Sequence, residues 1–179
     1  QAREAISSSQ NLLREYRHSQ WDVEHVLLAL LQLTQGVPAR ILSQAHVDPD
    51  LLADRVEAAL RQSPRLGVVA QTIYATPRLQ QVLDNARAEA ERLRDKFISA
   101  EHLLLAIADE TSGDCARIFK EVNLTKEKIY QALVEIRGRN RVTSETAEQR
   151  YQALEQYGTD LTQLARDRRL DPVVGREKE

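Results

Sequence analysis

The chain has 179 residues, of which 42% are hydrophobic and 29% charged, and its formal net charge is -2. This content suffices for a core without covalent staples, and one cysteine, Cys115, excludes an internal disulfide framework and suits the reducing cytoplasm in which we place the protein. The near-neutral charge excludes a global attraction to nucleic acid or to an anionic membrane, and no stretch approaches the roughly 18 apolar residues that span a bilayer.

The first predicted helix spans residues 2–16, where apolar and small residues three or four apart share one face that includes Ile6 and Leu13. The same face recurs 77 residues later and includes Leu79 and Leu83. The second copy opens on a threonine and a proline, which suit the cap and the first turn of a helix. The first copy lacks such a start, so we expect the natural chain to begin a few residues earlier.

Two similar nine-residue stretches follow the capping residues Asp22 and Ser99. They run from Val23 to Leu31 and from Ala100 to Ala108, and five of their nine positions are identical at an offset of 77. Beyond the shared Glu-His pair, both stretches are apolar on all sides, which is typical of a buried helix. The chain therefore contains an internal repeat with a buried helix in each copy.

Shorter third helices and longer fourth helices complete each copy. The third helices are predicted over residues 38–45 and 115–122, and Asp114 is expected to cap the second of them. The fourth helices begin at two further capping residues, Asp48 and Thr125. Four helices in each copy, in one register, predict an all-α fold of eight helices in two pseudo-twofold repeats.

The repeat also predicts the domain organisation. The inter-repeat loop holds helix breakers and β-branched residues, and we expect its apolar side chains to pack over the seam between the repeats. The alternative is a mobile flap over a binding groove. A polar linker, predicted to be flexible, leads into short helical patterns that have too little apolar surface to fold alone. The predicted segments are an N-terminal domain (1–137) made of repeat one (1–62), the inter-repeat loop (63–76) and repeat two (77–137), then the linker (138–149) and the start of an incomplete domain (150–179).

The polar residues offer little for catalysis. The two Glu-His pairs, Glu24-His25 and Glu101-His102, have neither the spacing nor the further ligands of a metal site. We assign them a structural role, with the carboxylate at the positive helix end and the imidazole against a neighbouring helix or its backbone. Cys115 is interpreted as a packed residue, because no nearby histidine would activate its thiol. Phosphate-loop and nucleophile-elbow motifs are absent from the sequence, so we expect no metal and no catalytic residue in this chain.

The stretch from Phe97 to Ala106, Phe-Ile-Ser-Ala-Glu-His-Leu-Leu-Leu-Ala, and its earlier copy resemble the Clp amino-terminal domain, a double repeat of four helices in front of AAA+ unfolding machines. The resemblance covers residues 2–137. Two motifs in the tail, at 151–162 and 170–177, are similar to the entry of the first ATPase domain of such machines. The residues at 141–143 are more similar to ClpB disaggregases than to the ClpC or ClpA partners of proteases.

The resemblance implies a role within a larger machine. The full-length protein would be a homohexameric ring that uses ATP and Mg2+, and this module would recruit unfolded or aggregated protein, or an adaptor protein, for threading through the pore. Val173, Val174 and Gly175 match the Val-Ile-Gly that lies against adenine in related ATPases, with one conservative change. This implies an adenine contact in the full-length protein only. The chain alone is expected to be a monomer that holds no nucleotide and has no ATPase activity.

A client site is predicted at the seam between the repeats. The first helix of each repeat offers apolar surface that a small unit cannot wholly bury, so its side chains are predicted to form the floor of a groove. The resemblance implies that two acidic residues near the second buried helix take part, and we place them at the rim, although Lys96 stands where the family often has a further acid. The predicted site residues are Ile6, Leu13, Leu79, Leu83, Asp95 and Glu101.

Two other functions stay open beside the disaggregase. One is an adaptor-docking domain of a ClpC-like or ClpA-like unfoldase that feeds a protease. The other is a rigid spacer or ring-stabilising element without a ligand of its own. A measurement of binding separates the spacer from the first two functions.

Overall fold

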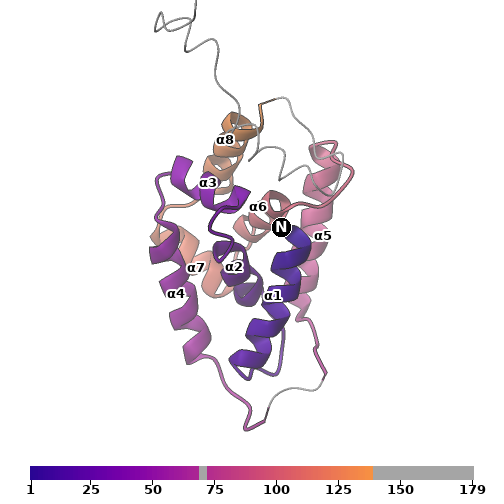
Figure 1. Ribbon diagram of the computed structural model, residues 1–179, viewed down its shortest axis with the longest axis vertical. Helices are drawn as coiled ribbons and strands as arrows, with labels where there is room; N and C mark the ends of the chain where they lie inside the picture. The colour runs from indigo at the N-terminus through magenta and orange to yellow at the C-terminus, as the bar shows by residue number, and fades with distance from the viewer. Residues whose placement is uncertain (69–71, 139–179) are drawn as a thin grey trace, which may run out of the picture. The chain divides into compact units, whose positions relative to one another are not determined.

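The structure is a computed structural model that describes residues 1–68 and 72–138. The predicted linker from residue 139 onward, the tail, and Val173, Val174 and Gly175 lie outside the described residues. The described part is all-α, as predicted (Figure 1). Its eight helices are α1 (Ala2–Glu15), α2 (Val23–Leu31), α3 (Val37–Gln44), α4 (Pro49–Gln62), α5 (Pro77–Arg92), α6 (Ala100–Ala108), α7 (Gly113–Glu121) and α8 (Lys126–Arg137).

Most helix starts are the ones that the sequence predicts. The Asp22 carboxylate accepts from the Val23 amide at 2.8 Å, and the Asp48 carboxylate accepts from the Asp50 amide at 2.9 Å. The hydroxyl oxygen of Thr76 accepts from the Leu79 amide at 3.1 Å. These side chains satisfy amide groups that have no partner inside their own helix.

One predicted cap is wrong. The helix α7 begins at Gly113 and its N-cap residue is Ser112, two positions before the predicted Asp114. Asp114 lies inside the first turn, where its carboxylate pairs with Arg117 at 2.8 Å. A residue inside the first turn favours the positive helix end without capping it, which explains why the composition alone misplaced this boundary.

Left-handed turns close the first and third helices at equivalent places in the two repeats. The backbone φ is positive at Arg17 and Arg94, which follow α1 and α5, and at His46 and Asn123, which follow α3 and α7. Each pair is separated by 77 residues. The backbone therefore repeats in its turns as well as in its helices.

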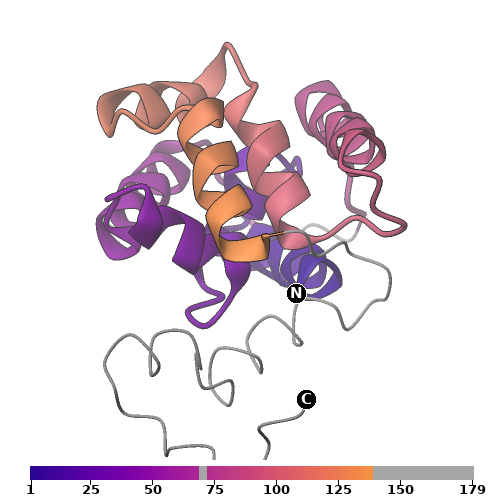
Figure 2. The ribbon, with the colours of Figure 1, turned by 90° about the horizontal axis from the view of Figure 1, so that it is seen from above.

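The core lies around α2 and α6, which contact each other (Figure 2). Every residue of α2 is buried. In repeat one α1 and α4 pack on α2, and in repeat two α5 and α8 pack on α6. The third helices cross over, so that α3 packs on α8 and α7 packs on α4. The two repeats therefore interlock in one core, and the third helices take part in the seam at which the repeats meet.

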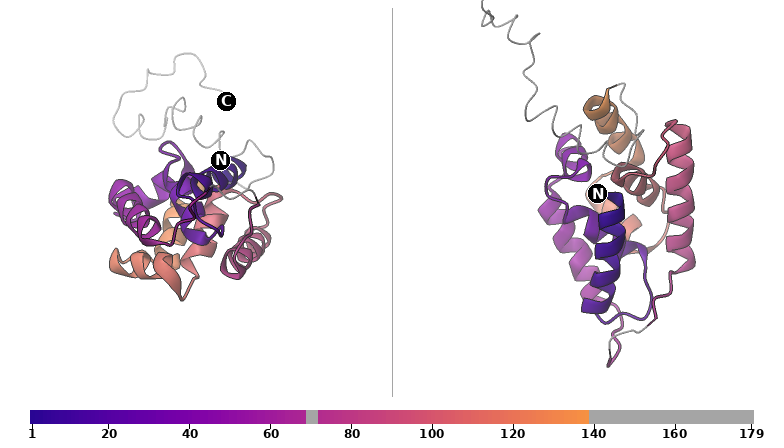
Figure 3. Two further views of the ribbon diagram at one scale, coloured as in Figure 1. Left: turned by 90° about the horizontal axis from the view of Figure 1, so that it is seen from below. Right: turned by 45° about the vertical axis from the view of Figure 1, so that its right-hand side comes forward.

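The described residues of the inter-repeat connection pass the end of α1 (Figure 3), and backbone hydrogen bonds hold them there. The Leu66 amide donates to the Arg17 carbonyl at 2.7 Å, and Trp21 forms a parallel bridge with Ala75. Two apolar side chains of the described part of this connection do not pack inward as predicted, since Val68 is 75% exposed and Tyr74 is 67% exposed, whereas Ile73 is half-buried. Backbone pairing, rather than these two side chains, therefore anchors the described part of the connection. None of the helices described has the length and apolarity to cross a membrane.

Candidate functional site

A buried polar cluster, formed by Asp95, His102 and Arg137, supports the start of α6. The Asp95 carboxylate accepts from Arg137 Nη2 at 2.7 Å and lies 2.9 Å from His102 Nε2. The side chains of Asp95 and His102 are fully buried. Arg137 is the last residue of α8, so this cluster ties α8 to the turn that precedes α6. A buried carboxylate with a guanidinium partner and a ring donor is well compensated for its loss of water.

The hydrogen bonds determine the tautomer of His102. The Ser99 amide donates to His102 Nδ1 at 2.9 Å, so Nδ1 is an acceptor and carries no proton. Burial lowers the pKa of His102, and the nearby Asp95 carboxylate opposes this shift. The neutral ring therefore carries its proton on Nε2 and donates it to Asp95.

The order Ser99, His102, Asp95 has the connectivity of a hydrolytic triad, because Ser99 Oγ lies 2.8 Å from His102 Nδ1. All three residues are buried, so a substrate has no access to the hydroxyl. The same Nδ1 already accepts from the backbone and forms a capping box with Ser99. The arrangement therefore stabilises a helix start and does not activate a nucleophile.

The other Glu-His pair is supported differently. Asp22 donates its amide to His25 Nδ1 at 3.1 Å, so His25 Nε2 carries the proton and donates it to His18 Nδ1 at 2.8 Å. Burial, aided by the neighbouring His18, lowers the pKa of His25 to about 4. Both predictions of a structural Glu-His pair are confirmed, because each ring bonds the backbone at its own helix start.

A guanidinium clamp joins the repeats at Arg78 of α5. It donates to Glu24 at 2.8 Å, to Glu110 at 3.0 Å through Nε, and to Asp22 at 3.3 Å. Gly113 leaves room for the clamp, since a Cβ there would lie 2.3 Å from Arg78 Nη2. The Glu110 hydrogen bonds are the first cause of a raised Arg78 pKa, so this residue stays charged. Its partner Glu24 is the acidic residue of the first Glu-His pair.

The structure separates the predicted site residues into two groups. Ile6 on α1 and Leu83 on α5 are half-buried, so part of each side chain is accessible. Leu13 and Leu79 are fully buried in the core. Each of these helices packs on its own repeat's central helix, α1 on α2 and α5 on α6.

The two predicted acidic residues do not lie at a rim. Glu101 has no exposed surface, and one of its oxygens lies 3.9 Å from Arg137 Nη1. Asp95 is buried with the same arginine. The packing of α8 causes the burial of Asp95 and Glu101, because Arg137 at its end brings a positive charge to the start of α6. The sequence alone does not show that α8 covers this helix start.

Sequence reasoning missed the exposed apolar pair Phe97 and Ile98, in the turn between α5 and α6. They are 40% and 43% exposed. The equivalent residue of Ile98 in repeat one is Trp21, which is buried. The repeat offers a signal for this exposed pair, because the large Trp21 of repeat one is replaced by the smaller Ile98 at the equivalent position of repeat two.

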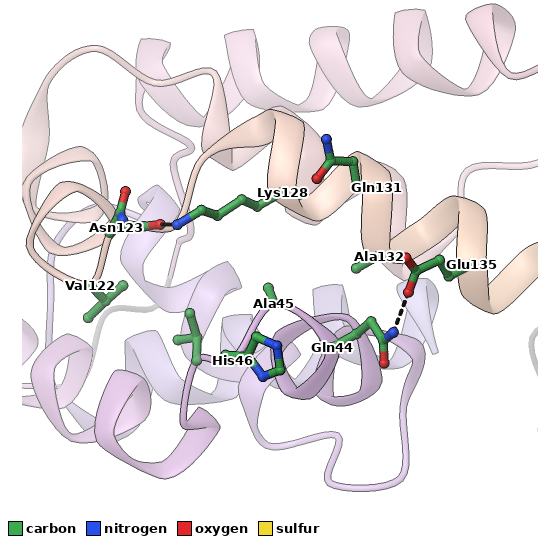
Figure 4. A pocket seen from close by; sticks show the side chains of 10 residues that line it. Gln44, Ala45, His46, Val122, Asn123, Lys128, Gln131, Ala132 and Glu135 are labelled. Carbon is green, nitrogen blue, oxygen red and sulfur yellow. Dashed lines mark hydrogen bonds between the residues drawn. The ribbon is translucent and has the colours of Figure 1, made fainter.

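An open pocket of about 440 Å3 lies between the ends of α3 and α7 and the side of α8 (Figure 4). Its lining is largely polar. Lys128 Nζ donates to the Asn123 carbonyl at 2.7 Å, and Gln44 donates to Glu135. None of the predicted site residues lines it. The ammonium of Lys128 fits a helix C-terminus, so the pocket already holds its own counter-charge.

The described residues contain no group of three or more His, Cys, Asp or Glu side chains placed to hold a metal ion. The thiol of Cys115 is buried, and burial raises its pKa well above the ordinary value. Such a thiol is a poor nucleophile. What the site offers chemically is therefore hydrogen bonding and apolar contact.

Comparison with known proteins identifies a family model and relatives that match this chain. The model of the Clp repeat (R) N-terminal domain matches residues 1–122. The chaperone protein ClpB of Bacillus cereus is 40% identical over 98% of this chain, which covers 21% of that protein. The chain thus spans about a fifth of the length of the curated relatives it matches.

Two solved structures have a similar fold. The Hsp104 N-terminal domain from Candida albicans superposes with a TM-score of 0.73 at 22% identity and covers 82% of this chain and 95% of that one. A complex of the ClpV N-domain with a VipB peptide superposes with a TM-score of 0.58 at 18% identity, covering 74% of this chain and 82% of that one. At these identities the likeness concerns the fold.

Proposed function

Since the chain belongs to the family of the Clp repeat N-terminal domain, we propose that it recruits unfolded or aggregated polypeptide to an ATP-dependent disaggregase of the ClpB type. The observation that carries this proposal is the set of apolar side chains left exposed beside a closed core. Exposed apolar groups bind unfolded chains without reading their sequence. Exposed large apolar residues of the two connections are Leu66, Val68, Tyr74, Phe97 and Ile98.

The predicted groove residues have different roles in this proposal. Ile6 and Leu83 contact the client, because part of each side chain is accessible. Leu13 and Leu79 support them from the core. Asp95 and Glu101 act through Arg137 as positioning residues that hold the turn before α6. A few shallow contacts of this kind give affinities on the order of micromolar or weaker, which suits transfer into a pore.

The longer protein supplies the rest of the machine in this proposal. It forms a cytoplasmic homohexamer that binds ATP and Mg2+, with Val173, Val174 and Gly175 against adenine. The chain itself acts as a monomer without ATPase activity. Sedimentation of the 179-residue chain and an assay of phosphate release test these two statements directly.

A binding titration tests recruitment. The labelled chain is titrated with a permanently unfolded protein, and the affinity of the unsubstituted chain is compared with that of Leu83→Asp. Leu51→Asp, the same change at an exposed leucine of α4, is the matched control. We expect weaker binding by about 10-fold or more for Leu83→Asp alone. Equal affinities for folded Leu83→Asp and Leu51→Asp would remove Leu83 from the site, and no binding by the unsubstituted chain would favour the rigid spacer.

A second function, docking of an adaptor protein, is favoured by one observation. A ClpV N-domain of similar fold was solved in complex with a VipB peptide. In an unfoldase that feeds a protease, the same surface would hold one defined adaptor. Competition separates the functions: unrelated unfolded proteins displace one another from a client site, whereas an adaptor site selects a single sequence.

A further inference from the structure

We propose that Arg78 is a positioning residue, which holds α5 and its client-contacting Leu83 at a fixed place relative to Ile6 on α1. This inference rests on the proposed function and names what shapes its binding surface. Ile6 lies in repeat one and Leu83 in repeat two, at equivalent positions 77 residues apart. The distance between them therefore depends on contacts that cross between the repeats.

The packing of α5 ties it mainly to its own repeat. The helix packs along α6 and makes a smaller contact with α2. Near its end, Lys126 Nζ lies 2.7 Å from a Glu89 oxygen, and the Arg92 guanidinium lies over the Tyr130 ring, 4.9 Å from its centre. Lys126 and Tyr130 belong to α8, so these two contacts stay within repeat two. The polar contacts that join α5 to repeat one gather at its start.

The start of α5 is bonded to the start of α2. Thr76 caps α5, and its hydroxyl donates to the Asp22 carboxylate at 2.6 Å. Asp22 in turn caps α2. Beside these caps lies the guanidinium of Arg78. It reaches carboxylates on three segments, at Asp22, Glu24 and Glu110. A planar fork with three partners fixes orientation as well as distance, which a single ion pair does not.

Two of the three carboxylates are almost buried. The side chains of Glu24 and Glu110 are 9% and 8% exposed. Water and salt screen such pairs less than pairs on the surface, so their attraction to the guanidinium is stronger. Without Arg78, these carboxylates would lie in the interior without a counter-charge. Movement of the start of α5 away from α2 would then let water reach them.

The equivalent position in repeat one has a different contact. It is Gln1, whose side-chain oxygen accepts from the Val37 amide at 3.1 Å, a neutral bond within repeat one. Each of the two side chains lies beside the glycine at the start of a third helix, Gly36 or Gly113. Arg78 therefore converts a contact at a helix start into one that joins the repeats.

Distances between spin labels test the positioning on the 179-residue chain. The labels are placed at Ser7→Cys on α1 and Asp84→Cys on α5, two exposed and equivalent positions. Cys115 is buried, so it does not compete for the label. We expect the distribution of distances to be about 2-fold broader in Arg78→Met than in the labelled chain with Arg78 intact, because the start of α5 loses its link to α2.

Two further variants make the test specific. Lys126→Met also removes a cation from a buried carboxylate, that of Glu89, but this contact lies within repeat two. We expect it to leave the distribution unchanged. Arg78→Lys keeps a positive charge and loses the planar fork, so it should broaden the distribution while circular dichroism shows a folded chain. Arg78→Lys decides the test if Arg78→Met does not fold.

The affinity for a permanently unfolded protein connects positioning with recruitment. We expect binding to be about 5-fold weaker in Arg78→Lys, because a surface that is not held in its bound form binds less tightly. Lys126→Met should bind with the affinity of the unsubstituted chain.

The outcomes separate this inference from the proposed function. An unchanged distribution in Arg78→Lys, or broadening of the same size in Lys126→Met, would overturn the positioning role while recruitment stands. A broader distribution with unchanged affinity would overturn it too, because the place of α5 would then not matter to the client. No binding of the unfolded protein by the unsubstituted chain would overturn both.

Discussion

The two repeats share a backbone but support their central helices with different chemistry. The positions occupied by His18, His25 and Leu60 in repeat one are occupied by Asp95, His102 and Arg137 in repeat two. Repeat one therefore has a neutral pair of rings, 2.8 Å apart between nitrogens. Repeat two has a carboxylate that bonds a ring and a guanidinium.

This difference teaches that a capping box requires only a ring nitrogen at the third helical position, whatever lies behind the ring. His25 and His102 both accept from the amide of their capping residue. The second nitrogen is then free to donate to an imidazole or to a carboxylate. The fold tolerates either choice because the proton on the second nitrogen of His25 and of His102 finds an acceptor in both repeats.

The largest expected effect comes from breaking the charged cluster. Arg137→Met removes the guanidinium from Asp95 and Glu101, two buried carboxylates. We expect a loss of unfolding free energy of about 3 kcal/mol or more, measured by urea denaturation, because a buried charge loses its partner. Leu60→Met, the equivalent position in repeat one, is the control and should cost less than about 1.5 kcal/mol. Similar losses for the two variants would show that the cluster is not what makes position 137 critical.

Acid should weaken repeat one through His25. Its pKa is lowered from 6.5 to about 4 in the folded protein, so the unfolded chain binds the proton first as the pH falls. The stability contributed by the neutral ring is complete above pH 6.5 and is lost between 6.5 and about 4, by about 3 kcal/mol.

The variant His25→Gln isolates this effect, because glutamine keeps a capping-box acceptor and does not titrate. We expect its unfolding free energy to fall less between pH 7 and pH 4.5 than that of the unsubstituted chain. His102→Gln is the matched variant in repeat two and should flatten the profile less, since Asp95 opposes the lowering of the His102 pKa. An unchanged profile for His25→Gln would contradict the assignment.

Transferring the charged cluster of repeat two into repeat one tests how the neighbours of each histidine determine its pKa. The double variant His18→Asp with Leu60→Arg builds the cluster of repeat two into repeat one. We expect the pKa of His25 to rise by about 1 unit or more, because a carboxylate replaces an imidazole beside its ring. Titration of the His25 proton resonances measures this pKa. His18→Asp alone should destabilise the fold, since its carboxylate is then buried without a guanidinium. A His25 pKa that stays at about 4 in the double variant would mean that burial alone determines it.

The smallest expected change in stability concerns the left-handed turns after α1 and α5, and it should be equal in the two repeats. Arg17 and Arg94 have φ of 56° and 57°, a conformation that costs a side chain more than it costs glycine. Arg17→Gly and Arg94→Gly should each stabilise the chain by up to about 1 kcal/mol in thermal denaturation. Unequal shifts would indicate that the two turns differ in more than sequence.

Local chemistry determined much of the fold from sequence. A cap acts within three residues of its helix start, so Asp22, Asp48, Thr76 and Thr125 could be assigned without knowing any neighbour. The offset of 77 related Asp22 to Ser99 and Asp48 to Thr125. The burial of α2 and α6 followed from helices that are apolar on all sides.

Only the tertiary structure shows which basic residues pair with the buried carboxylates. Arg78 reaches Glu24 across 54 positions of the chain, and Arg137 reaches Asp95 across 42. Such pairs depend on how α5 meets α2 and how α8 meets α6, and these are contacts between helices far apart in the chain. Placing Asp95 and Glu101 at a rim failed for this reason: whether a charge is buried depends on the helix that covers it, and no local pattern encodes that helix.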